Sequence, residues 1–334
     1  MSRRGTRPSP ADGTPLPRPR PGSSPAGREV GDGTCRTWDP GGPYALAGNL
    51  RVLRRGPYDP TCRTAADGSV WRTMRSPAGA VTLRIAHPGP VVEARAWGPG
   101  APWALDRLPS LLGADDDPGA FVAHHRLLRE AHRRNPGLRL VRTGLVMEAL
   151  IPAVLEQKVT AEEAHRSWRR LVRRFGEPAP GPHQDLYVMP GPRTWALVPS
   201  WEWHRAGVDG KRSATVLRAV RRWSRMEEAA RMAPDAALAR LCAVPGIGPW
   251  TAAETVQRSN GDPDAVTVGD LHLPGIVGHA LAGRRDADDE EMLRLLAPYA
   301  EQRQRHRATR LLLTTGRVPP RRAPRMPRVD IARW

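Results

Sequence analysis

The chain has 334 residues, which is too long for one small hydrophobic core and suits two or three packed subdomains. It carries 52 lysines and arginines against 34 aspartates and glutamates, so its formal net charge of +18 favours a polyanionic partner such as nucleic acid. The three cysteines (Cys35, Cys62 and Cys242) lack metal-ligand spacing and are too few for an iron–sulfur cluster, and no apolar run is long enough to span a bilayer.

The first segment, residues 1–42, is rich in proline, glycine, serine and arginine and poor in apolar residues. Such a segment buries too little surface to offset its chain entropy, so we expect a disordered basic tail and no signal peptide. Residues 317–334 have a similar composition and are expected to form a second basic, flexible tail. Either tail could contact a polyanion or simply remain solvated.

Residues 43–117 are expected to form a small β-rich domain. Residues 80–86 alternate apolar and polar side chains, residues 87–90 have turn composition, and residues 91–97 alternate again. This pattern predicts a β-hairpin within a small antiparallel sheet.

Residues 118–316 are expected to form a mainly helical domain, so the predicted fold class is α+β, with the sheet domain first. The helical periods and end signals predict helices at 120–134, 145–155, 160–175, 209–226, 235–242, 249–258 and 290–314. Nothing in this pattern repeats along the chain.

The most informative stretch is Leu-Cys-Ala-Val-Pro-Gly-Ile-Gly-Pro-Trp-Thr-Ala, residues 241–252. Two helices at about residues 235–260 would flank a tight turn, in which Gly246 and Gly248 let the backbone approach another molecule and Ile247 anchors the turn in the core. Amides at such a turn, beside a helix N-terminus, favour an anion. We expect a DNA phosphate to bind at Val244, Gly246, Ile247, Gly248 and Thr251, without sequence readout. An ordinary helical corner is the alternative.

This stretch resembles the helix-hairpin-helix motif of the DNA glycosylase superfamily. About twenty residues later, these enzymes carry a Gly/Pro-rich loop that ends in an essential aspartate. Residues 261–271 contain such a loop, and Asp270 takes the aspartate's place. The sheet domain before the helices makes the chain most similar to the 3-methyladenine DNA glycosylase II branch, and the resemblance covers about residues 43–315.

The resemblance implies that Asp270 is the catalytic carboxylate. Breaking an N-glycosidic bond builds positive charge on the sugar, and a carboxylate stabilises that charge and can orient or deprotonate water. By local sequence alone Asp270 could instead be a helix N-cap, and both roles are compatible. Bifunctional members attack the sugar with a lysine at the position of Trp250, so the resemblance implies a hydrolase of alkylated bases in base-excision repair, without lyase activity.

A flipped base needs a pocket, and an electron-poor alkylated base stacks well on an indole. The resemblance makes Trp250 the best pocket candidate, with Trp201 and Trp203 as weaker ones. Any of these tryptophans could equally be core. Glu254 lies one helical turn beyond Trp250, where the family often has an aromatic residue, so its carboxylate leaves the substrate range open.

The segment at Gln157 and Lys158 matches the family residues that fill the gap left by the flipped base. The family usually has an apolar wedge at the second position, and Lys158 departs from it. Lys158 could hold a phosphate or the opposite base, or be an ordinary basic residue near a helix start.

The remaining expectations concern cofactors and partners. No cofactor and no iron–sulfur cluster are expected, although the resemblance implies a structural Na⁺ or K⁺ held by the carbonyls of Cys242, Val244 and Ile247. The expected partner is double-stranded DNA with damaged bases, bound by a cytoplasmic monomer that contacts no membrane and associates with the nucleoid. The alternative is a helix-hairpin-helix protein that binds DNA or lesions without catalysis.

Overall fold

The computed structural model describes residues 33–319. Most of the two predicted basic tails, residues 1–32 and 320–334, lies outside this range. One boundary of the first tail is wrong, because Thr34–Trp38 forms strand β1. This edge strand pairs its backbone with a central strand but leaves nearly all its side chains exposed, so its sequence carries no apolar signal.

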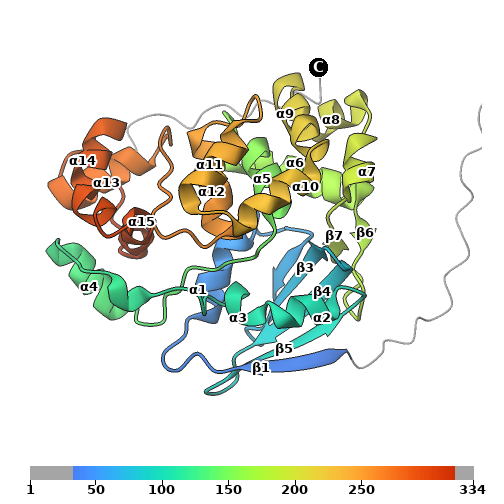
Figure 1. The fold of residues 1–334 in the computed structure, drawn as a ribbon, viewed down its shortest axis with the longest axis horizontal. Helices are drawn as coiled ribbons and strands as arrows, with labels where there is room; N and C mark the ends of the chain where they lie inside the picture. The colour runs from blue at the N-terminus through green and yellow to red at the C-terminus, as the bar shows by residue number, and fades with distance from the viewer. Residues whose placement is uncertain (1–32, 320–334) are drawn as a thin grey trace, which may run out of the picture.

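Five antiparallel strands form the sheet, in the spatial order β1-β5-β4-β3-β2 (Figure 1). They are β1 (Thr34–Trp38), β2 (Cys62–Thr64), β3 (Val70–Ser76), β4 (Gly79–Ala86) and β5 (Val92–Trp97). The predicted hairpin is therefore confirmed as β4 and β5. Val81, Leu83 and Ile85 alternate along β4 and are fully buried, which explains why the alternation was readable in the sequence.

Helices account for most of the rest, so the α+β class is confirmed. They are α1 (Leu46–Leu50), α2 (Ala101–Asp106), α3 (Leu108–Leu111), α4 (Arg126–Arg134), α5 (Val146–Leu155), α6 (Ala161–Phe175), α7 (Pro192–Ala196), α8 (Ser200–Ala206), α9 (Gly210–Val220), α10 (Trp223–Glu227), α11 (Pro234–Cys242), α12 (Pro249–Ser259), α13 (Leu273–Ala282), α14 (Asp289–Ala300) and α15 (Arg305–Thr314). Short 3₁₀ turns lie at Arg51–Leu53, Pro118–Ala120 and Glu228–Arg231, and a two-stranded ribbon pairs β6 (Glu177–Pro178) with β7 (Tyr187–Val188).

Three predicted helices are shorter or divided. The predicted helix 290–314 is broken into α14 and α15 at Arg303, whose φ of 55° is left-handed. The guanidinium of Arg305 makes two hydrogen bonds to Asp264, of 2.9 and 2.6 Å, and this contact fixes the direction of the new helix. The predicted helix 209–226 divides into α9 and α10, and the helical part of 120–134 begins at Arg126.

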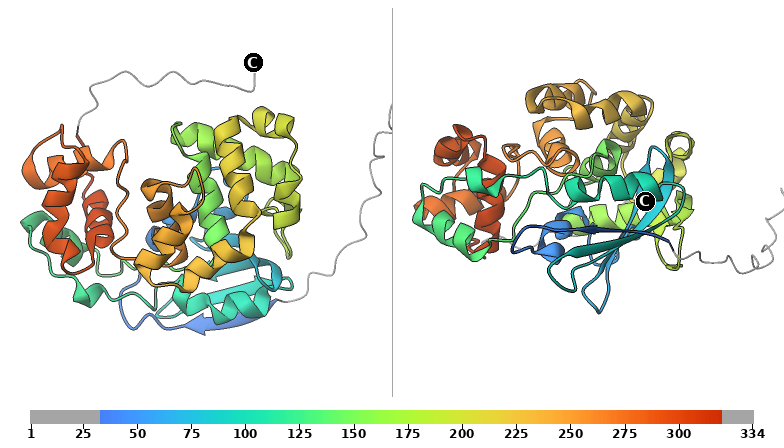
Figure 2. Two further views of the ribbon diagram at one scale, coloured as in Figure 1. Left: turned by 45° about the horizontal axis from the view of Figure 1, so that its top comes forward. Right: turned by 60° about the horizontal axis from the view of Figure 1, so that its bottom comes forward.

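The hydrophobic core has three clusters. One lies among α5–α12, the second between the sheet and α1–α3, and the third among α4 and α13–α15. In both Figure 1 and Figure 2, α11 and α12 lie between the α13–α15 group and the helices α5–α10. The hairpin between α11 and α12 is therefore bordered by helices on both sides.

Buried ion pairs join the sheet domain to α5. Arg72 of β3 contacts Glu148 at 2.8 Å, and Arg55 contacts Glu156, just after α5, at 2.9 Å. Burial raises the pKa of Glu148, and the two arginines Arg72 and Arg75 oppose that shift. These contacts fix the end of α5 against the sheet domain. Across residues 33–319, the apolar stretches of the helices are too short to cross a bilayer.

Candidate active site

The glycine-rich stretch forms the predicted hairpin between α11 and α12. Val244 and Ile247 are 2% and 4% exposed, and the Ile247 amide donates to the Val244 carbonyl at 3.0 Å to close the turn. Gly246 has a φ of 97°, and a Cβ at this position would lie 2.1 Å from Oγ1 of Thr215. The turn therefore needs glycine at position 246 for both its backbone angle and its contact with α9.

Some amides of the hairpin are bonded within the turn, and others are left to bind an anion. The amide of Val244 donates to the carbonyl of Leu241, so neither it nor the Ile247 amide faces an incoming anion. Gly248 is the N-cap of α12, carries no capping side chain and has open space where a Cβ would lie. Pro249, the first residue of α12, has no N–H, so the amides of Gly248 and Trp250 on either side of it are the ones left for the predicted phosphate contact.

The predicted gap-filling turn lies against this hairpin. Gln157 donates from Nε2 to the carbonyl of Gly246 at 2.9 Å and to Oγ1 of Thr251 at 2.8 Å. Lys158 is exposed and has a φ of 55°, an unusual angle for a residue with a side chain. Thr251 is 2% exposed, so its hydroxyl holds Gln157 rather than a DNA phosphate.

Asp270 has a carboxylate fixed by three hydrogen bonds. Its Oδ1 accepts from the amides of His272 and Leu273, both at 2.8 Å, at the start of α13. Its Oδ2 accepts from the indole Nε1 of Trp250 at 3.0 Å. The N-cap of α13 is His272, so Asp270 is not the N-cap that the local sequence allowed; its carboxylate instead accepts from the two amides that precede and begin the helix.

Two acidic residues that the sequence analysis missed shape the loop before Asp270. The carboxylate of Asp289, on α14, accepts from the amide of Gly269 at 2.9 and 3.0 Å. Asp264 is held by Arg305 of α15. These partners lie 20 and 41 residues apart along the chain, and no local pattern in the sequence marks such pairs.

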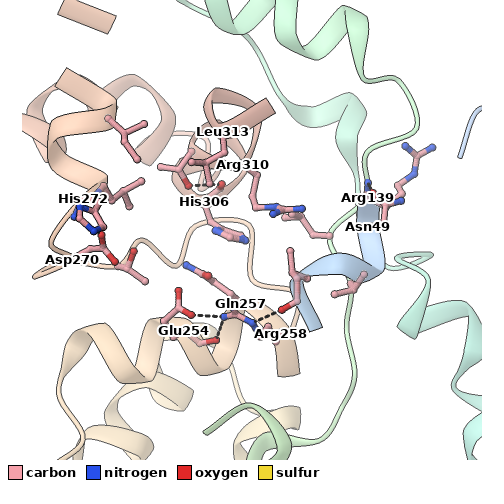
Figure 3. A pocket seen from close by; sticks show the side chains of 17 residues that line it. Asn49, Arg139, Glu254, Gln257, Arg258, Asp270, His272, His306, Arg310 and Leu313 are labelled. Atoms are coloured by element: carbon pink, nitrogen blue, oxygen red, sulfur yellow. Dashed lines mark hydrogen bonds and ion pairs between the residues drawn. The ribbon is translucent and has the colours of Figure 1, made fainter. Parts of the chain in front are cut away.

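Asp270 opens on a cavity of about 210 Å³ between α12 and α15 (Figure 3). A single water needs only about 10–15 Å³ and pockets for drug-sized ligands measure about 300–1,000 Å³, so this volume suits one heterocycle. Figure 3 shows Asp270 and His272 at one end of the cavity and Asn49 and Arg139 at the other. Because Asn49 lies on α1 of the sheet domain, both domains form the cavity.

The predicted tryptophans do not line this cavity, and only Glu254 and Asp270 among the predicted site residues do. Trp203 is 2% exposed and stacks on Trp195 in the α5–α12 core, with ring centroids 5.6 Å apart. Trp201 is 64% exposed and lies with Trp203 on helix α8. Trp250 contributes through its hydrogen bond to Asp270 instead of through the cavity wall.

Some charged groups that line the cavity have an oppositely charged partner and others do not. Arg258 contacts the Glu254 carboxylate at 2.7 Å and donates to the carbonyl of Val52 at 2.9 Å, so these two charges balance. Burial lowers the pKa of Arg310 to about 10, helped by the neighbouring Arg258, and leaves the group cationic at neutral pH. Burial also holds the pKa of His306 well below its usual value, so its imidazole is neutral.

The described residues contain no group of three histidine, cysteine, aspartate or glutamate side chains placed to hold a metal ion. The monovalent cation implied by the hairpin carbonyls remains a prediction. Of the three predicted ligands, the Val244 carbonyl already accepts a hydrogen bond from the Ile247 amide.

Comparison with solved structures identifies the class of fold. A 3-methyladenine DNA glycosylase from Archaeoglobus fulgidus matches with a TM-score of 0.66, covering 83% of this chain and 97% of the other at 18% identity. An 8-oxoguanine glycosylase/lyase from Clostridium acetobutylicum, in complex with DNA, matches with a TM-score of 0.65 over 82% and 92% of the two chains, at 12% identity. The chain has the fold of the helix-hairpin-helix DNA glycosylase superfamily.

Sequence comparison finds similarity to a curated protein over part of the chain. The chain is 31% identical over 228 residues to a probable bifunctional transcriptional activator/DNA repair enzyme AlkA of Mycobacterium tuberculosis. That alignment covers 64% of this chain and 44% of the relative, so the chain spans less than half of the curated relative's length. No protein-family model matches the chain. Together, the AlkA relative and the 3-methyladenine glycosylase fold confirm the resemblance stated from the sequence.

Proposed function

We propose that this chain is a monofunctional DNA glycosylase, which hydrolyses the N-glycosidic bond of a damaged base in double-stranded DNA. One observation carries the proposal. Gln157 is bonded to the hairpin, the hairpin begins the helix that carries Trp250, and Trp250 is bonded to Asp270 at the mouth of the cavity. The residues proposed to enter the duplex, the hairpin proposed to contact a phosphate and the fixed carboxylate of Asp270 are thus linked by hydrogen bonds.

The proposed reaction begins with extrusion of the base into the cavity, because the glycosidic bond is inaccessible within a stacked duplex. As the base leaves, positive charge develops on the sugar, and the fixed carboxylate of Asp270 stabilises that charge electrostatically. The remaining lone pair of Asp270 Oδ2 can orient the attacking water or take its proton. The hydrogen bonds from two amides and one indole hold the carboxylate in place, so little reorganisation is needed.

The same geometry argues against a lyase step. A lyase needs an amine that reaches the sugar carbon, and the chain has only two lysines, Lys158 and Lys211. Neither lines the cavity, and the indole of Trp250 occupies the place beside Asp270. We therefore propose base release that leaves the abasic strand intact.

We take the substrate class and the repair pathway from the family resemblance. It makes an alkylated base of the 3-methyladenine type the first lesion to test, within base-excision repair and with the protein acting as a monomer. The M. tuberculosis relative is named as a DNA repair enzyme, which supports this setting. A DNA- or lesion-binding protein without catalysis is the competing proposal.

Base release from methylated duplex DNA tests the proposal, with Asp270→Asn compared against wild type. The asparagine Oδ1 can still accept the two backbone hydrogen bonds, so folding and DNA binding should be retained. Loss of the carboxylate charge should lower the rate on the order of 100-fold or more. Asp286→Asn, a change of the same charge at an exposed position, is the matched control and should behave as wild type. DNA binding by wild type without base release from any lesion would favour the competing proposal.

A further inference from the structure

The cavity beside Asp270 has an unusual lining for a site that receives a base. Trp, Tyr and Phe are absent from its seventeen lining residues, all within the described range, and the two ring systems present are the imidazoles of His272 and His306. Recognition of a cationic alkylated purine relies on stacking against an electron-rich ring face. This cavity supplies no indole or phenol face for that purpose.

Instead, the cavity contains polar groups with unused hydrogen-bonding capacity. Within residues 33–319, Arg310 makes no hydrogen bond and no ion pair, although its side chain is partly buried in the cavity wall. The imidazole of His306 is also without a partner there, and the residue is only 7% exposed. Gln257 donates from Nε2 to the carbonyl of Ala265 at 2.7 Å, which leaves its Oε1 as an acceptor.

These groups lie between the two ends of the cavity. Figure 3 shows His306 and Arg310 on α15 opposite Glu254, Gln257 and Arg258 on α12. The Glu254–Arg258 pair is internally neutral, and Asp270 lies at the end where the sugar would enter. Arg310 is therefore the uncompensated charge in the part of the cavity that would hold the heterocycle.

An uncompensated guanidinium and a neutral imidazole fit one kind of base edge. A carbonyl oxygen can accept from Arg310, and an adjacent ring N–H can donate to Gln257 Oε1 or to the free nitrogen of His306. A base that carries a positive charge would bring a like charge next to Arg310 in a site with little water, which is unfavourable. The hydrogen bonds and the charge repulsion therefore both favour a neutral base over a cationic one.

We propose that this cavity selects a neutral damaged base whose buried edge carries a carbonyl oxygen and a ring N–H, such as a deaminated or oxidised purine, over a cationic alkylpurine, with Arg310 and His306 as the recognition residues. The inference rests on the proposed glycosylase function and differs from the substrate that the family resemblance suggests. It makes no change to the role of Asp270.

Base release is measured at saturating enzyme from three matched duplexes, which contain hypoxanthine, 8-oxoguanine or 3-methyladenine at one position, because 3-methyladenine is cationic in DNA and carries no carbonyl. Each rate is divided by the spontaneous rate of release of the same base, because cationic bases leave more readily on their own. Hypoxanthine or 8-oxoguanine should show the larger enhancement. Arg310→Gln should lower that enhancement roughly 10- to 100-fold, the range expected for one hydrogen bond to a charged group, and should not lower it for 3-methyladenine, which offers no carbonyl to Arg310.

Arg134→Gln is the matched control, because it removes the same charge from an exposed site on α4. Binding of the three duplexes to the Asp270→Asn protein gives a second readout, in which the Arg310→Gln change should weaken only the neutral lesions. A larger enhancement for 3-methyladenine, or an unchanged ratio of neutral-base to 3-methyladenine release in Arg310→Gln, overturns the inference while the glycosylase function stands. Release of no base from any duplex overturns the proposed function itself.

Discussion

Gly246→Ala tests the hairpin most directly, because two independent features of the structure oppose it. The residue has a φ of 97°, and a left-handed angle costs a residue with a side chain about 1–2 kcal/mol. The new Cβ would also lie 2.1 Å from Oγ1 of Thr215, which is itself held by a 2.9 Å hydrogen bond to the carbonyl of Lys211. Forcing a methyl group into such a contact costs about 1–3 kcal/mol.

The two costs sum to about 2–5 kcal/mol of unfolding free energy. At an unfolding entropy of about 2.1 cal/mol/K per residue, the Tm of a 334-residue chain falls by about 1.4 °C per kcal/mol, so the Tm should fall by about 3–7 °C. Gly248→Ala is the matched control, since its φ of −97° suits any residue and a Cβ there meets nothing within 4 Å. Its stability should stay within about 0.5 kcal/mol of wild type.

The two variants separate folding from DNA contact. In Gly248→Ala the methyl group projects where a phosphate would approach the start of α12, so DNA affinity should fall although the Tm does not. Thermal unfolding and fluorescence anisotropy with a duplex measure the two effects. A Gly246→Ala protein as stable as wild type would refute the turn geometry. A Gly248→Ala protein with full DNA affinity would refute the phosphate contact.

Two further predictions concern the groups around the site. Burial alone would raise the pKa of Glu156, but Arg55 and a hydrogen bond from His165 lower it to about 2, below the unfolded value of about 4.5. The Glu156 carboxylate should therefore contribute about 3 kcal/mol to the free energy of unfolding above pH 4.5, and this contribution should disappear as the pH falls toward 2. Between pH 6 and pH 3, the free energy of unfolding measured with denaturant should therefore change less in Glu156→Gln than in wild type. An equal change in the two proteins would contradict the pairing of Glu156 with Arg55. Trp250→Phe removes the indole donor to Asp270 and should slow base release roughly tenfold in single-turnover kinetics, with DNA affinity unchanged; an unchanged rate would show that the indole does not position the carboxylate.

The sequence by itself determined the parts of this protein whose signals are local. Alternation in residues 80–97 predicted the β4–β5 hairpin, because only one face of those strands is buried. The glycines and prolines of residues 245–249 predicted the turn between α11 and α12, because backbone angles at such a turn admit few residue types. The spacing from that turn to Asp270 then indicated the carboxylate through resemblance.

Tertiary structure alone decided which side chains meet at the site. Trp203 and Trp250 were both candidates for the base pocket, yet one packs in the core and the other bonds to Asp270, because helix packing rather than residue type sets exposure. His306 and Arg310 gave no signal, since they lie about forty residues beyond Asp270 on a helix whose start depends on the Asp264–Arg305 contact. A cavity formed by two domains has no local pattern in the chain, so its chemistry appears only after folding.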